Sequence, residues 1–170
     1  MAKLTGGRSV GDGVDGQAPD PCRGGRRLAA IGLGGISILW LGMLLGVSFL
    51  ATPVKFLAPS LTLPVALDVG RQTFATFNWV EIGLWTMLLA SALAGRTRWR
   101  VVAVVAGIGA VLALQTLWLL PTLDARVEAI LRGGMPPPSS LHLVYILLDV
   151  LKLVFLGVIA FAGVRRMAAP

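Results

Sequence analysis

The stretch from Leu28 to Ala51 reads LAAIGLGGISILWLGMLLGVSFLA and contains no charged residue. An α-helix rises about 1.5 Å per residue, so about 20 apolar residues cross a hydrocarbon core about 30 Å thick. The stretch therefore predicts a transmembrane helix. Arg26 and Arg27 precede it, as in a twin-arginine signal. However, the run is too long for the apolar region of a cleaved signal, and further apolar runs follow, which favours an uncleaved first span.

The composition extends this interpretation to the whole chain. Of the 170 residues, 56% are hydrophobic and 14% are charged, whereas soluble domains carry about 25% charged residues. The net charge of +7 would suit a nucleic-acid partner, but the basic residues form short runs beside apolar stretches, which is typical of membrane topology signals. The expected partner is therefore the lipid bilayer, and no nucleic-acid partner is expected.

Apolar runs of spanning length recur along the chain. They predict an all-α, polytopic membrane protein, a four-transmembrane-helix bundle whose membrane domain covers residues 28–166. The expected spans are 28–51, 72–94, 101–120 and 141–164.

Two connections between the spans have a character of their own. The segment Thr52–Gly70 is apolar but broken by prolines, so we expect it to lie at the outer interface or to form a re-entrant segment, and the sequence leaves both open. In the second connection, Leu123, Val127 and Ile130 recur at helical spacing between charged residues. This pattern predicts a short amphipathic helix over 122–132 that lies on the membrane surface.

The two ends of the chain set the expected orientation. Residues 1–27 are rich in glycine and basic residues and predict a disordered tail, in which the only cysteine, Cys22, is expected to be an inert thiol. Lysines and arginines gather in this tail, at Arg96–Arg100 and at Arg165–Arg166. The positive-inside rule then predicts a multi-pass protein of the inner (plasma) membrane with both termini in the cytoplasm.

Three ionisable residues fall inside the expected spans, namely Glu81, Asp149 and Lys152. A charge at the bilayer centre costs about 2.5–3.5 kcal/mol even on the lenient insertion scale, so each should be paired, neutralised or hydrated. Counted from the outer ends of their spans, all three lie about 12–17 Å deep. If the second and fourth spans are neighbours, Lys152 can pair with either carboxylate. One carboxylate is then in excess, so one carboxyl carries a proton or a further cation completes the set.

Neutral polar residues share the helix faces of these charges. The candidate intramembrane polar site consists of Asn78, Glu81, His142, Tyr145, Asp149 and Lys152. Arg71 and Gln115 are possible partners nearer the outer end, and Gly42 and Gly46 form a small-residue pair that permits close helix packing or a homodimer.

Two interpretations of the charges stay open. They form a proton or ion relay or a small-ligand pocket in a transport or resistance accessory, or they fix helix packing in a structural or interaction subunit that recognises itself or another membrane protein. The sequence offers a single histidine and a single cysteine, no spaced methionine pair and no nucleophile–base triad. We therefore expect no metal site, no cofactor and no enzymatic activity.

Several short motifs, in order along most of 28–164, carry a family resemblance. They are Trp40-Leu41-Gly42, Phe49 to Pro53 with Phe56, Gly70-Arg71, Phe74 to Glu81, Gln115 to Pro121 with Arg126, and His142 leading to Tyr145, Asp149 and Lys152. With them the chain resembles the small four-helix membrane proteins related to transmembrane protein 205, which include a bacterial family named only as a domain of unknown function. The glycine-rich tail and the Pro136–Pro138 turn depart from that pattern. The resemblance implies the four-span fold and no established activity.

Overall fold

The computed structural model describes residues 21–168, which are helical over nearly their whole length. Four helical runs are long and apolar enough to cross a membrane. These runs are Arg27–Leu57, Leu63–Ala94, Trp99–Leu131 and Leu141–Met167. The predicted fold class, an all-helical protein with four helices of spanning character, is confirmed for the described residues.

The first run is built from α1 (Pro21–Leu44), the π-helical segment η1 (Leu45–Ala51), α2 (Thr52–Val54) and the short 3-10 segment η2 (Lys55–Leu57). The second is α3 (Leu63–Ala94). The third joins α4 (Trp99–Leu114), the π-helical segment η3 (Gln115–Leu119) and α5 (Leu120–Leu131), and the fourth is α6 (Leu141–Ala168).

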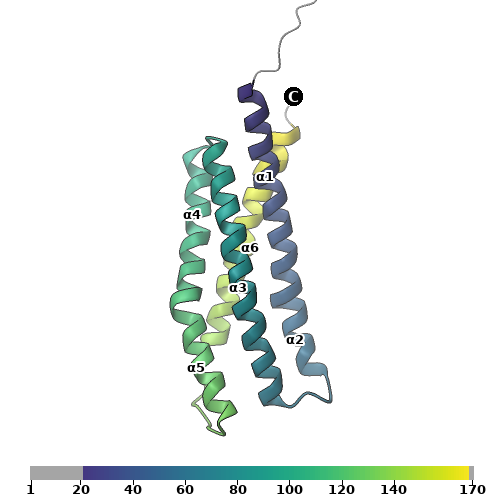
Figure 1. Ribbon diagram of the computed structural model, residues 1–170, viewed down its shortest axis with the longest axis vertical. Helices are drawn as coiled ribbons and strands as arrows, with labels where there is room; N and C mark the ends of the chain where they lie inside the picture. The colour runs from purple at the N-terminus through teal and green to yellow at the C-terminus, as the bar shows by residue number, and fades with distance from the viewer. Residues whose placement is uncertain (1–20, 169–170) are drawn as a thin grey trace, which may run out of the picture.

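The four runs alternate in direction along one bundle axis (Figure 1). The start of α1, the end of α6 and the turn between α3 and α4 lie at one end, which we call the terminal end. The connections from η2 to α3 and from α5 to α6 lie at the other, which we call the loop end. Helix α1 packs on both α6 and α3, and α4 packs on α3 and α6.

Most of the apolar core lies in the half of the bundle nearer the terminal end. Its fully buried members include Leu33 of α1, Leu88 of α3, Ile108 of α4 and Leu156 of α6. Large apolar side chains also cover the outside of every long helix, as expected of helices that face lipid. Between the core and the loop end, the bundle interior becomes polar.

Pro53 and Pro121 lie within helical runs rather than ending them, which corrects two expectations about helix ends. Residues 52–70 do not form a separate segment, because α2 and η2 continue the first run and α3 already begins at Leu63. Their position relative to the membrane interface stays a prediction. Likewise, Pro121 does not end the third helix, and α5 continues α4 through η3 as part of one run. Residues 122–131 are thus helical as expected, as part of α5, and their position on the membrane surface stays a prediction.

A π-helical segment precedes both Pro53 and Pro121 and lets the helix continue through each of them. The residue just before each proline, Thr52 or Leu120, donates its N–H to the carbonyl five residues earlier, Val47 or Gln115 respectively. Proline has no N–H and its ring clashes with the carbonyl four residues back in a regular helix. A π-helical turn is wider, so it relieves that clash without ending the helix.

The remaining sequence expectations concern the ends and the glycines. The expected tail lies outside the described residues except for 21–27, which are helical within α1. Neither Gly42 nor Gly46 has another helix of the described chain against it, so their role in self-association stays a prediction. The close small-residue approach lies instead between Gly34 of α1 and Gly163 of α6.

Candidate functional site

The interior of the bundle contains one layer of charge, contributed by α3 and α6. Glu81 and Lys152 have no exposed surface and Asp149 is 1% exposed. Asp149 and Lys152 are three apart and therefore lie on one face of α6. That face turns toward Glu81, whereas the other faces of α6 are mostly apolar and pack on α1 and α4 or face outward.

Lys152 joins the two carboxylates. Its Nζ lies 2.6 Å from Oε1 of Glu81 and 3.0 Å from Oδ1 of Asp149. Both pairings that the sequence allowed are therefore present at once. Because water is excluded, these charge-assisted contacts are stronger than the same contacts at a surface.

Two neutral side chains complete the layer from the other two helical runs. Trp40 of α1 donates its indole N–H to Oε1 of Glu81 at 3.0 Å. Gln115 of η3 donates from Nε2 to Oδ1 of Asp149 at 2.9 Å. We call the set Trp40, Glu81, Gln115, Asp149 and Lys152 the charged layer.

Trp40 is a member of the site that the sequence did not predict, and Gln115 lies deeper than the sequence predicted. The third run is longer than expected, so Gln115 lies well inside it and not near its end. Trp40 carries the only indole of the first span, and a buried indole N–H usually finds an acceptor. The sequence therefore indicated that this indole needs an acceptor, but no local pattern identified Glu81 as that acceptor.

The charged layer contains acceptor atoms that lack donors. Among the described residues, Oε2 of Glu81, Oδ2 of Asp149 and Oε1 of Gln115 are buried without a hydrogen-bond partner. An unpaired buried acceptor costs about 1–3 kcal/mol, and more when it is charged. Two carboxylates against one ammonium also leave a formal excess of one negative charge. The layer is thus suited to take up one further proton or small cation.

Asn78 lies one turn from Glu81 on the loop-end side. Its Oδ1 accepts a hydrogen bond from the Thr116 hydroxyl at 2.8 Å, and that hydroxyl also lies 2.7 Å from the carbonyl of Leu112. A hydroxyl has one proton to donate, so the two acceptors share it. Asn78 therefore borders the charged layer without contacting its charges.

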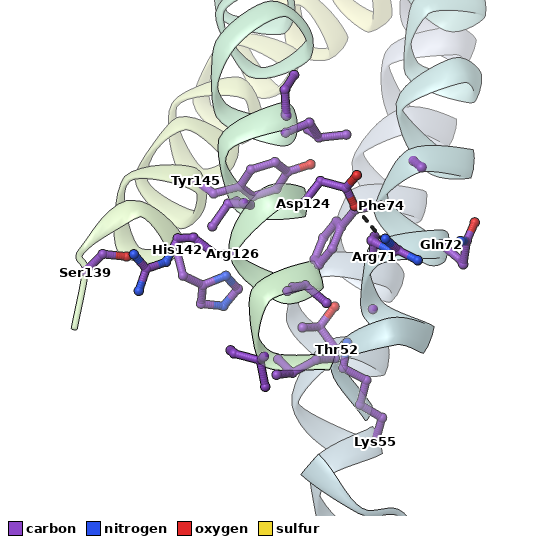
Figure 2. Close-up of a pocket in the computed structure, with 18 of the residues that line it drawn as sticks. Thr52, Lys55, Arg71, Gln72, Phe74, Asp124, Arg126, Ser139, His142 and Tyr145 are labelled. Carbon is purple, nitrogen blue, oxygen red and sulfur yellow. Dashed lines mark ion pairs between the residues drawn. The ribbon is translucent and has the colours of Figure 1, made fainter. Parts of the chain in front are cut away.

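A cavity of about 700 Å³ opens between the charged layer and the loop end (Figure 2). Tyr145 and Phe74 line it and pack edge to face with ring centroids 5.0 Å apart. Thr116 lines it too. His142 lies on the cavity side and outside the charged layer. The six sequence-predicted residues thus divide, with three in the layer and Asn78, Tyr145 and His142 between it and the loop end.

Arg71, a possible partner of the intramembrane charges, does not reach into the charged layer. Its Nη2 lies 2.9 Å from Oδ1 of Asp68, and its Nε lies 3.3 Å from Oδ1 of Asp124. Figure 2 shows the Arg71–Asp124 pair across the cavity from His142. Two acids at the loop end therefore hold this arginine.

Comparison with known proteins gives one family and no individual relative. The family model described as a domain of unknown function, DUF4149, matches residues 36–129. Neither a curated protein nor a solved structure matches the chain. The matched region includes Trp40, Glu81 and Gln115 of the charged layer, whereas Asp149 and Lys152 lie beyond it. These comparisons do not bear on the expected relation to transmembrane protein 205, which stays a prediction. Since the match covers more than half of the chain, the protein belongs to the DUF4149 family.

Proposed function

We propose that this protein is a component of proton- or ion-linked transport, with Glu81, Asp149 and Lys152 as its exchangeable centre. The observation that supports this most directly is the trio of buried oxygens without donors on Glu81, Asp149 and Gln115. An ionised carboxylate far from water is costly unless a cation or proton balances it. A centre that contains one cation for two carboxylates has a reason to bind another.

The surroundings of the charged layer favour access from one side. The cavity reaches Tyr145, which lies one helical turn from Asp149, and Thr116, which follows Gln115 in the chain. On the opposite side, the apolar core around Leu88 and Ile108 closes the bundle. A proton or cation can thus approach from the loop end, and its passage onward requires the core to open.

Flux measurements test this proposal. The full chain is reconstituted in vesicles that contain a pH-sensitive or a sodium-sensitive dye, and a potassium diffusion potential drives proton or sodium uptake. We expect uptake above that of protein-free vesicles, and we expect Glu81→Gln and Asp149→Asn to abolish it. Both variants keep the side-chain volume and remove one carboxylate, so Lys152 still has a partner.

A matched control uses an acid outside the charged layer. Glu128→Gln removes an exposed carboxylate that pairs with Arg132 at the loop end, and we expect wild-type uptake. Circular dichroism checks the helix content of every variant. Wild-type uptake no faster than that of empty vesicles, or full uptake by folded Glu81→Gln protein, would refute the proposal.

One observation favours a structural role instead. The charged layer joins all four helical runs, because Trp40, Glu81, Gln115 and Lys152 come from four different ones. A hydrogen-bonded layer of this kind can fix the register of a membrane bundle. If that is its whole role, the combined change Glu81→Met, Asp149→Leu and Lys152→Met should leave a folded protein whose cellular phenotype is intact. Under the transport proposal, the same protein folds but loses the phenotype.

We further propose that the protein has no enzymatic activity, that it resides in the inner membrane with cytoplasmic termini, and that its partners are lipid, further copies of itself or another membrane protein. The basic residues of the α3–α4 turn and of the end of α6 lie at the same end of the bundle as the start of α1. That clustering supports the orientation through the positive-inside rule.

A further inference from the structure

The cavity at the loop end combines apolar walls with basic side chains. Leu67 and Phe74 of α3 face Val127 and Ile130 of α5 across it. Lys55, Arg71 and Arg126 also line it, against a single lining acid, Asp124. Its volume of about 700 Å³ falls within the range of about 300–1,000 Å³ typical of small-molecule sites.

Two of the three cationic side chains that line the cavity have no acidic side chain as a partner. Arg71 is held by Asp68 and Asp124. Within residues 21–168, no carboxylate lies at ion-pair distance from Lys55 or Arg126. The guanidinium of Arg126 donates to the backbone carbonyl of Pro137, which fixes its position and leaves its charge uncompensated.

Lys55 projects from η2 onto α3. Its ammonium lies 5.1 Å from the ring centroid of Phe56 and 5.9 Å from that of Phe74. It also lies over Gly70, where a side chain would collide with it. The glycine thus leaves room for the ammonium at the cavity wall, and the aromatic faces partly stabilise the charge.

We propose that this cavity binds an anionic amphiphile, whose phosphate or carboxylate is attracted by the uncompensated charges of Lys55 and Arg126 and whose hydrocarbon part lies against Phe74, Val127 and Ile130. A neutral apolar molecule would leave the two cations without a counter-charge. A small hydrophilic anion would leave the apolar side chains of the cavity walls exposed to water. Basic pockets between transmembrane helices are suited to anionic lipid headgroups. This site is distinct from the charged layer and does not depend on ion exchange there.

Two sources supply this chemistry, a phospholipid of the bilayer and a free single-chain acid, and photolabelling distinguishes them. The full chain is placed in phosphatidylcholine nanodiscs that contain one probe at equal mole fraction. The probe is phosphatidylglycerol, phosphatidylcholine or a fatty acid, each with a photoactivatable acyl chain. Mass spectrometry then gives the labelling of α5 relative to that of α4, whose outer face contacts bulk lipid and serves as an internal reference.

We expect at least one anionic probe to label α5, relative to α4, several-fold more than phosphatidylcholine does. Preference for phosphatidylglycerol assigns the site to bilayer lipid, and preference for the fatty acid assigns it to a free acid. Equal ratios for all three probes would overturn the proposal. The double change Lys55→Gln and Arg126→Gln should raise the concentration for half-maximal labelling about tenfold, since hydrogen bonds to charged groups are worth that much or more.

Two further variants keep this test decisive. Arg132→Gln removes an arginine just beyond α5 that is exposed, outside the cavity lining and paired with Glu128, so it should leave labelling unchanged. Ile130→Trp adds bulk at the apolar wall of the cavity and keeps every charge, so it should weaken the preference even if the double variant fails to fold. Undiminished anion preference in folded Ile130→Trp protein would place the label elsewhere and refute the site.

Discussion

At the scale of single residues, the charged layer depends on one ammonium. Lys152 neutralises Glu81 and holds Asp149 three residues away on the same helix. Trp40 and Gln115 add hydrogen bonds but no charge. Lys152 is therefore the one positive charge of the layer. The two carboxylates depend on it for charge balance, and the neutral donors Trp40 and Gln115 cannot provide that balance in its place.

This asymmetry predicts unequal effects of substitution on stability. Lys152→Met keeps the length of the side chain but leaves two buried carboxylates without a cation, so we expect the free energy of unfolding to fall by about 3 kcal/mol. Glu81→Gln preserves the Lys152–Asp149 contact and should cost about 1 kcal/mol. Reversible unfolding in mixed micelles, followed by circular dichroism, measures both. Equal losses would show that Lys152 does not hold the layer together.

The sequence predicted the charged members of this layer better than the neutral ones. Glu81, Asp149 and Lys152 each interrupt an apolar run, so the cost of burying a charge marks them without any knowledge of the packing. Trp40 and Gln115 are polar groups that membrane helices carry for many reasons. Their acceptors are set by how α1 and η3 pack on α3 and α6, which is a non-local property of the chain.

At the scale of helices, hydropathy correctly predicted the four helical runs, whereas the positions of the prolines predicted some of their ends wrongly. Pro53 and Pro121 indicate helix ends by the usual rule, because each removes a donor and clashes with the preceding turn. The structure widens the preceding turns into η1 and η3 instead. Whether a chain breaks or widens at a proline depends on what the next turns pack against. Here α5 continues the third run and packs on α3.

The crossing of α1 and α6 provides a prediction at this scale. A Cβ atom at Gly163 would come within 2.7 Å of the backbone N and Cα of Gly34. Gly163→Ala should therefore push the helices apart and lower the free energy of unfolding by about 1–3 kcal/mol. Gly157→Ala on the same helix meets no atom within 4 Å and should be neutral or slightly stabilising. Unfolding of the two variants side by side measures the difference, and equal stabilities would contradict the close approach.

At the scale of the whole molecule, the bundle interior changes in character along its axis. Most of the apolar core lies nearest the terminal end, the charged layer follows, and the cavity lies nearest the loop end. Hydropathy averaged over each helix cannot show this order, because it depends on which faces meet. The order has a functional consequence under the transport proposal, since the apolar core then forms the barrier that an ion at Glu81 must cross.

That consequence requires the bundle to have one orientation, which the basic residues predict. Arg96, Arg98 and Arg100 surround the α3–α4 turn at the terminal end, so this end should face the cytoplasm. In a Cys22→Ser background, Ser60→Cys in the η2–α3 turn should react with a membrane-impermeant maleimide in intact cells. Thr97→Cys in the α3–α4 turn should react only after the cells are permeabilised. The reverse pattern would place the cavity on the cytoplasmic side, and any ion that reached the charged layer through it would then come from inside the cell.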